Sequence, residues 1–166
     1  MHALIASDGS EVSLEAARRG VALLRPTKIT LLTIADTSIA DDSGAGGFEG
    51  NVLSAGESQQ VRGVILEEGK DELALTLDAM GVDPSIVEHK LVEGSAGASI
   101  CLVASQLSPD VVVVGSHGRG FFKRVVLGSV SEYVAHHCTS PVLIVRHADR
   151  DDAETTSADP STAADE

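Results

Sequence analysis

The chain is poor in aromatic and basic side chains. It has no tryptophan, one tyrosine and three phenylalanines among 166 residues, and 12 lysines and arginines against 25 aspartates and glutamates. Proteins that bind single-stranded nucleic acid without sequence preference stack the bases on aromatic rings in a basic groove. A chain with a formal net charge of −13 instead repels nucleic acid and anionic membrane surfaces. The composition therefore argues against both as partners.

Long apolar runs and abundant cysteine are also lacking. No run of eighteen apolar residues occurs, and the first residues enter a strand pattern without a charged segment followed by an apolar one. We therefore expect a soluble, cytoplasmic protein. The two cysteines, Cys101 and Cys138, both fall in predicted helices, so we expect small core thiols rather than a disulfide.

The length suits one domain, residues 1–146, followed by an acidic tail. Residues 147–166 contain seven acids and one arginine, which account for −6 of the net charge. This tail cannot bury enough apolar surface to offset its ordering entropy, so we predict that it is disordered. Residues 37–56 show no periodicity and are predicted to be a flexible loop. This loop would either close over a ligand or remain solvent-exposed without contacting one.

Strand and helix patterns alternate along the domain. Short apolar runs predict strands at 3–7, 28–36, 85–93, 111–115 and 141–146. A helix is expected in each interval between consecutive strands, and periodicity and capping residues place these helices between Ser10 and Pro26, at 57–80, at 96–107 and from Ser129. The alternation predicts the α/β class: a single-domain, doubly wound parallel sheet of five strands with helices on both faces.

The most informative stretch combines a strand, a glycine-rich segment and a helix start. Four valines precede Gly115, Gly118 follows, and Ser129 is predicted to be a helix N-cap whose capping box Glu132 completes. The unpaired amides at a helix N-terminus carry about half a positive charge and stabilise a bound phosphate. Glycines in such a turn can serve turn geometry alone, but the combination predicts a nucleotide-phosphate site.

The spacing of Gly115, Gly118, Gly128 and Ser129 resembles the G-2x-G-9x-G-(S/T) ATP-binding signature of the universal stress protein family. It fits neither the P-loop nor the dinucleotide-binding fingerprint. The neighbouring segments VVVVGSHGRG and SPVLIV look like the same family. The resemblance implies the strand order 3-2-1-4-5, and ligands of such sheets bind where the winding reverses, here between the first and fourth strands.

The resemblance also implies roles for residues near the strand ends. Ala6-Ser7-Asp8-Gly9-Ser10 is similar to the family's A-x-D-x-S segment, whose Asp lies near the adenosine. Ile34 stands where a family residue meets the adenine edge through its backbone. The residues alone favour a turn or capping role for Asp8, and it is the resemblance that implies a role in binding. The expected nucleotide-binding residues are Ala6, Asp8, Ile34, Val114, Gly115, His117, Gly118, Gly128, Ser129 and Val130.

We expect an ATP-binding universal stress protein with a regulatory role in stress response. No catalytic residue is expected and any ATPase activity should be weak, because no water-positioning base or arginine finger is evident. No carboxylate cage for a metal is evident either, so the phosphates would carry Mg²⁺. The resemblance implies a homodimer through the last strand, Val142–Val145. The alternatives are a slow nucleotide hydrolase that uses Asp8 or His117, and a dimeric interaction module that binds no nucleotide.

Overall fold

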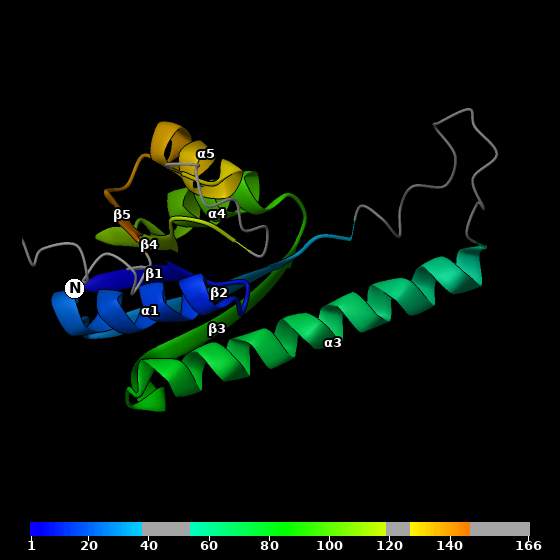
Figure 1. Cartoon of the computed structure of the whole chain (residues 1–166), viewed down its shortest axis with the longest axis horizontal. Helices are drawn as coiled ribbons and strands as arrows, with labels where there is room; N and C mark the ends of the chain where they lie inside the picture. Colours follow the sequence, from blue (N-terminus) through cyan, green and yellow to red (C-terminus); the bar gives the residue numbers. More distant parts are fainter. Residues whose placement is uncertain (38–53, 119–126, 147–166) are drawn as a thin grey trace, which may run out of the picture.

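The computed structural model describes residues 1–37, 54–118 and 127–146 (Figure 1). Most of the predicted loop 37–56 and the whole of the predicted tail 147–166 lie outside the described residues. The segment between the glycine-rich turn and the last helix, 119–126, lies outside them too. None of the described helices is both long and apolar enough to span a membrane.

The described chain alternates strands and helices around one parallel sheet. The elements are β1 (His2–Ala6), α1 (Glu11–Leu24), β2 (Lys28–Ala35), α3 (Ala55–Met80), β3 (Val87–Glu93), α4 (Ala96–Leu107), β4 (Val111–Gly115), α5 (Ser129–His137) and β5 (Val142–Val145). The sheet order is β3-β2-β1-β4-β5, with every pair of neighbours parallel. The predicted fold class and strand order are thus confirmed.

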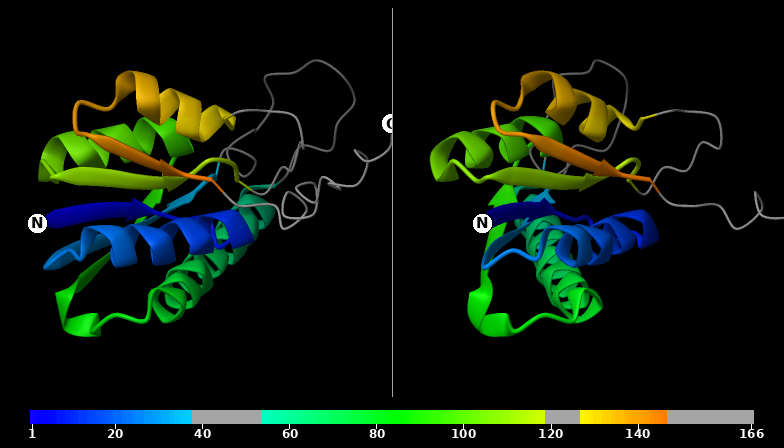
Figure 2. Two further views of the ribbon diagram at one scale, coloured as in Figure 1. Left: turned by 60° about the vertical axis from the view of Figure 1, so that its left-hand side comes forward. Right: turned by 90° about the vertical axis from the view of Figure 1, so that its left-hand side faces the viewer.

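Helices cover both faces of the sheet. α1 and α3 lie on one face and α4 and α5 on the other (Figure 2). Successive side chains of a strand point to opposite faces, so Ala3 and Ile5 join the core under α1 and α3 while Leu4 and Ala6 join the core under α4 and α5. The valines of β4 divide in the same way. This double coverage explains why the central strands are continuous apolar runs in the sequence.

Two helix boundaries follow from their caps. At α1, Ser10 is the N-cap and its hydroxyl accepts a hydrogen bond from the amide of Ser13. At α3, the side chain of Ser54 accepts from the amide of Glu57, whose carboxylate accepts from the amide of Ser54. This capping box starts α3 at Ala55, two residues before the start expected from the sequence.

The predicted capping box at Ser129 and Glu132 is wrong. Gly128 is the N-cap of α5, in an extended conformation (φ −78°, ψ 161°), and Ser129 is the first helical residue. The amide of Glu132 donates to the carbonyl of Gly128 at 2.9 Å, which fixes the helix start one residue earlier. The third strand also begins later than predicted, because Pro84–Ile86 form a short 3₁₀ helix before β3.

Only the second half of α3 packs on the sheet. Its buried residues are Gly69, Leu73, Thr76 and Met80, and the N-terminal turns extend beyond the sheet (Figure 1). Gly69 is unfavourable for a helix, but a Cβ there would lie 2.6 Å from Cδ1 of Leu91 on β3. The glycine therefore lets the helix approach the sheet closely.

Candidate functional site

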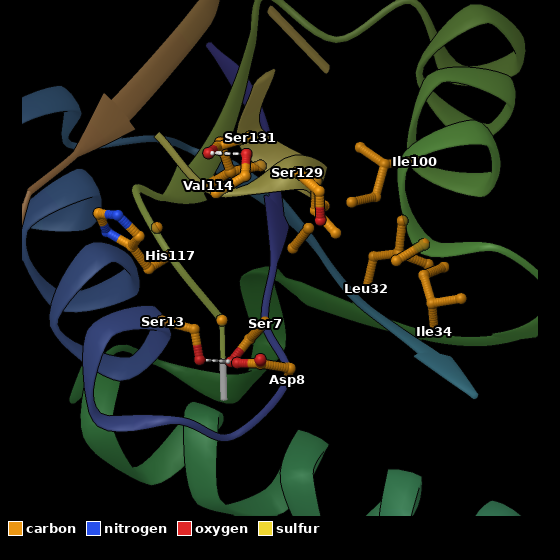
Figure 3. Close-up of a pocket in the computed structure, with 16 residues that line it drawn as sticks. Ser7, Asp8, Ser13, Leu32, Ile34, Ile100, Val114, His117, Ser129 and Ser131 are labelled. Carbon is orange, nitrogen blue, oxygen red and sulfur yellow. Dashed lines mark hydrogen bonds between the residues drawn. The ribbon is translucent and has the colours of Figure 1, made fainter. Parts of the chain in front are cut away.

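A cavity of about 320 Å³ opens beyond the carboxyl ends of β1, β2 and β4, where the winding of the sheet reverses (Figure 3). It is lined by Ala6, Ser7, Asp8, Ser13, Leu32, Ile34, Ala96, Ile100, Val114, Gly115, His117, Gly118, Gly128, Ser129, Val130 and Ser131. The structure thus brings all ten residues expected from the sequence around one pocket. Their role in binding stays a prediction.

One side of the pocket is apolar. Ala6, Leu32 and Val114 come from three adjacent strands and point to the sheet face covered by α4 and α5. Ile34 follows on the same face of β2, and Ile100 of α4 completes this side (Figure 3). These side chains offer a surface suited to a flat, weakly polar ring. Pockets of this kind combine an apolar lining with a few polar groups that orient the ligand.

A carboxylate lies at the opposite side of the pocket. Oδ1 of Asp8 accepts hydrogen bonds from the amide of Ser10 at 3.1 Å and from its hydroxyl at 2.6 Å. A Cβ at Gly118 would lie 2.9 Å from Oδ2 of the same carboxylate. The turn after β1 and the turn after β4 therefore meet at Asp8 and Gly118. Asp8 thus fixes the turn that precedes α1 and also faces the pocket.

The carbonyl of Ser116 joins the end of β4 to the start of α5. It accepts from the amide of Gly128 at 2.7 Å and from the hydroxyl of Ser131 at 2.8 Å. The amide of Ser116 donates to the carbonyl of Val145 on β5 at 2.9 Å. A Cβ at Gly128 would lie 3.2 Å from both Cα of His117 and the Ser116 carbonyl oxygen, so glycine permits this close approach.

The N-terminus of α5 faces the pocket with its amides. Helical geometry leaves the first amides of a helix without an intrahelical partner, and Ser129, Val130 and Ser131 of this first turn line the cavity. Among the described residues, no side chain caps them, since the N-cap is Gly128. The helix dipole adds partial positive charge at this end. The arrangement can therefore bind an anionic group such as a phosphate.

Sequence reasoning missed six lining residues: Ser7, Ser13, Leu32, Ala96, Ile100 and Ser131. Leu32 could have been found from Ile34, because residues two apart on a strand share a face. Ile100 lies one helical turn after Ala96, the first residue of the helix expected at 96–107. Ser7 and Ser131 gave no local signal, because their partners Thr76 and Ser116 are distant in the sequence.

The missed hydroxyls connect the pocket to the helices around it. Oγ of Ser7 lies 3.0 Å from Oγ of Ser13 on α1 and 2.8 Å from Oγ1 of Thr76 on α3. The three groups are buried, and the hydroxyls of Ser13 and Thr76 also donate to the carbonyls of Ser10 and Glu72, so they contribute structure rather than exposed donors. The described residues contain no group of three or more His, Cys, Asp or Glu side chains that could hold a metal ion.

Comparison with known families decides the membership of the chain. The sequence model of the universal stress protein family matches residues 1–146. The chain belongs to this family. It is 26% identical to universal stress protein MJ0531 of Methanocaldococcus jannaschii over 144 residues. This alignment covers 86% of this chain and 80% of that protein. It is 30% identical over 154 residues to universal stress protein Sll1388 of Synechocystis, covering 87% and 96%.

Other family members are longer than this chain. One universal stress protein of Mycolicibacterium smegmatis is 44% identical over 63 residues, which cover 38% of this chain and 21% of that protein. What such a protein does as a whole therefore does not transfer to this chain.

Solved structures of family members share the fold. UspA of Lactobacillus plantarum superposes with a TM-score of 0.71 at 20% identity, covering 88% of this chain and 97% of that one. An Arabidopsis thaliana family protein with AMP bound gives 0.54 at 16% identity, covering 94% and 97%. A universal stress protein in complex with cAMP gives 0.53 at 23% identity, covering 88% and 96%. Two relatives of this fold therefore hold adenine nucleotides.

Proposed function

We propose that this universal stress protein binds an adenine nucleotide, ATP, in the described pocket and acts as a regulatory protein in the response to stress. One observation carries the proposal: the start of α5, the glycine turn after β4 and an apolar wall surround one cavity at the switch point of the sheet. In open α/β sheets, ligands bind beyond the strand ends at this point.

Each part of the nucleotide has a matching part of the pocket. The base lies against the apolar side formed by Leu32, Ile34 and Ile100. The phosphates lie at the amides of Ser129 and Val130, where the helix dipole favours negative charge. The ribose lies between them, within reach of the Asp8 carboxylate.

The relatives support the ligand class. AMP and cAMP occupy two proteins of the same fold, and both share the adenine, ribose and phosphate that this pocket suits. The preference for ATP rests on the glycine spacing Gly115, Gly118 and Gly128 followed by Ser129, which resembles the family's ATP-binding signature. Mg²⁺ would be carried by the phosphates.

Substitution at Ser129 isolates the amide that would bind phosphate. Proline is favoured at the first helical position and keeps the helix, but it has no N–H. The extended conformation of Gly128 is the one that a residue before proline prefers. Ser129→Ala is the matched control, because both variants lack the hydroxyl and only Ser129→Pro also lacks the amide.

We expect Ser129→Pro to bind ATP roughly 10- to 100-fold more weakly than Ser129→Ala, since hydrogen bonds to charged groups contribute about 1.5–3 kcal/mol. Isothermal titration calorimetry on protein stripped of copurified nucleotide measures this difference. Adenosine, which has no phosphate, should bind both variants alike. Equal ATP affinities of the two variants would exclude the Ser129 amide from phosphate binding, and a wild type that binds no adenine nucleotide would overturn the proposal.

We infer a binding protein rather than an efficient enzyme. The titratable side chains that line the pocket are Asp8 and His117, and Asp8 already accepts two hydrogen bonds from Ser10. His117 Nδ1 lies 3.1 Å from the hydroxyl of Ser116. If the protein were a hydrolase, Asp8→Ala would abolish release of phosphate while ATP binding survived. We expect ATPase activity to be weak in the wild type and not to depend on Asp8.

We also propose a homodimer through β5. This strand is an edge of the sheet and pairs with β4 alone among the described strands. Val142, Leu143 and Ile144 are each only half-buried. An apolar edge strand with unpaired backbone groups is a template for pairing with a second strand, and a second copy of the chain supplies one.

A further inference from the structure

Two cysteines far apart in the sequence meet between α4 and α5. Cys101 lies on α4, and Cys138 is the residue at which α5 ends. Their Sγ atoms are 2.9 Å apart although the residues are separated by 37 positions. Both are free thiols and both are partly exposed. The sequence predicted small core thiols, and it could not predict that the two thiols contact each other.

We propose that Cys101 and Cys138 are a redox site, at which a peroxide converts the two thiols into an intramolecular disulfide between α4 and α5. The thiol contact makes this possible without separating the helices, because a disulfide joins sulfurs of side chains that already face each other. The start of α4 also approaches the middle of α5 closely, since a Cβ at Gly97 would lie 2.8 Å from the ring of Tyr133.

Two thiols alone favour a disulfide over a metal site here. The described residues offer no third His, Cys, Asp or Glu to complete a metal-binding group around the pair. Structural zinc is held by four ligands in a tetrahedron. Oxidation needs only the two sulfurs.

The reaction balances with one peroxide. The Cys101 thiolate attacks a peroxide oxygen, the O–O bond breaks, and Cys101 becomes a sulfenic acid while the released hydroxide takes up a proton to form water. The sulfur of Cys138 then attacks the sulfenic sulfur, forms the S–S bond and expels the second oxygen, which leaves as water with the Cys138 proton. The sulfurs lose two electrons and the peroxide gains them.

The order of the two steps follows from the environment of Cys138. Burial, together with the hydrogen bond to Cys101, raises the pKa of the Cys138 thiol to about 12. The thiolate is the nucleophile, and Cys138 therefore stays protonated at neutral pH. We assign the first attack on the peroxide to Cys101 and the second step to Cys138.

The disulfide would fix one wall of the pocket. α4 contributes Ile100 to the cavity and α5 contributes Ser129 and Val130. The loop closed by the bond, residues 101–138, includes β4 and the glycines of the pocket. A disulfide that closes a loop restricts the unfolded chain and stabilises the folded state. Oxidation would thus protect the fold and the pocket together.

The test is treatment of the purified full chain with hydrogen peroxide, followed by mass spectrometry of the intact protein and of its peptides. We expect the chain to lose the mass of two hydrogens, to yield a cross-linked peptide pair that contains Cys101 and Cys138, and to lose both maleimide-reactive thiols. The melting temperature should rise by about 10 °C and return to its starting value with dithiothreitol.

Cys101→Ser and Cys138→Ser are the matched controls, and neither should gain melting temperature on oxidation. Two thiols that stay reactive, oxidation to sulfinic acid without a cross-link, or a disulfide formed only between chains would each overturn the proposal. None of these readouts involves a nucleotide, so their failure leaves the proposed nucleotide site untouched.

Discussion

The hydroxyl of Ser131 is a single group that helps to fix the shape of the pocket. It is 2% exposed and donates to the carbonyl of Ser116 at 2.8 Å, with the Gly128 carbonyl also within 2.9 Å. Together with the amide of Gly128, it connects the end of β4 to the first turn of α5. Because the group is buried, its removal leaves this connection with one hydrogen bond fewer.

We expect Ser131→Ala to lower the free energy of unfolding by about 1 kcal/mol, the net value of a typical hydrogen bond. Urea denaturation measures it. Ser105→Ala is the matched control, because the exposed Ser105 hydroxyl also donates to a backbone carbonyl, that of Leu102, on helix α4. The control should change the free energy by less than about 0.5 kcal/mol. Equal effects of the two substitutions would contradict the role given to Ser131.

Single residues of the site were predictable only where backbone geometry dictates the residue type. The glycine spacing placed Gly115, Gly118 and Gly128 at the pocket, since a Cβ at any of them would crowd its neighbours. Ser7 and Ser131 could not be placed, because a hydroxyl's partner depends on which distant segments the fold brings together. The contact between Cys101 and Cys138 escaped prediction for the same reason.

Among the elements, α3 has a first turn whose stability depends on the helix's own N-terminal cap. Its buried residues begin at Gly69, so the first turns bury no side chain against the sheet, and Arg62 reaches it through an exposed ion pair with Glu93 of β3. The capping box of Ser54 and Glu57 supplies local stabilisation there. Hydrogen bonds from the Ser54 hydroxyl, and then from its amide, lower the pKa of the fully exposed Glu57 carboxyl.

The sign of the pH effect follows from this lowered pKa. The stabilisation is present above the ordinary pKa of glutamate and is lost as the pH falls through the lowered value. In Ser54→Ala the carboxyl loses the hydroxyl donor, and its pKa should rise towards the ordinary value. An NMR titration of the Glu57 side chain measures this. Ser58→Ala, four residues on, should leave that pKa unchanged, and an unshifted Glu57 in Ser54→Ala would refute the explanation.

Element types were predictable from periodicity, and element ends less so. The start of α3 was missed although Ser54 and Glu57 stand three apart, the spacing of a capping box. The start of α5 was misassigned for the opposite reason: Ser129 and Glu132 have that spacing, but Gly128 takes the N-cap position because its amide is bound to Ser116. A local pattern cannot reveal such a tertiary hydrogen bond.

For the whole molecule, the proposed dimer depends on the free edge of β5. The amide of Val112 donates to the carbonyl of Pro141, and that of Ser116 to the carbonyl of Val145. In a parallel ladder this alternation turns the amide of Val142 away from β4. A proline at position 142 would therefore remove an outward amide and keep the hydrogen bonds to β4.

We expect the wild type to have the mass of a dimer in light scattering at micromolar concentration. Val142→Pro should raise the concentration at which dimers dissociate by about tenfold or more, since each lost 1.4 kcal/mol is a factor of ten. Circular dichroism checks that the fold persists. A wild type that is monomeric at micromolar concentration would contradict the proposed dimer, and an unchanged dissociation of the variant would move the interface away from this edge.

The sequence was most informative about the fold class of the whole molecule. The alternation of strands and helices predicted the α/β class, because strands buried on both faces are continuous apolar runs. The strand order β3-β2-β1-β4-β5 came from the family resemblance rather than from the pattern. Periodicity alone does not determine the order in which strands pair.

The carbonyl of Ser116 has a consequence for how the site tolerates change. It accepts a hydrogen bond directly from the amide of Gly128, so the end of β4 is joined to the start of α5 by a contact that does not depend on residues 119–126. Closing a loop costs only about 0.6 kcal/mol more for each doubling of its length. A change in the length of this connection would thus cost the fold little free energy, although the nine-residue spacing from Gly118 to Gly128 is part of the signature on which the proposed nucleotide site depends.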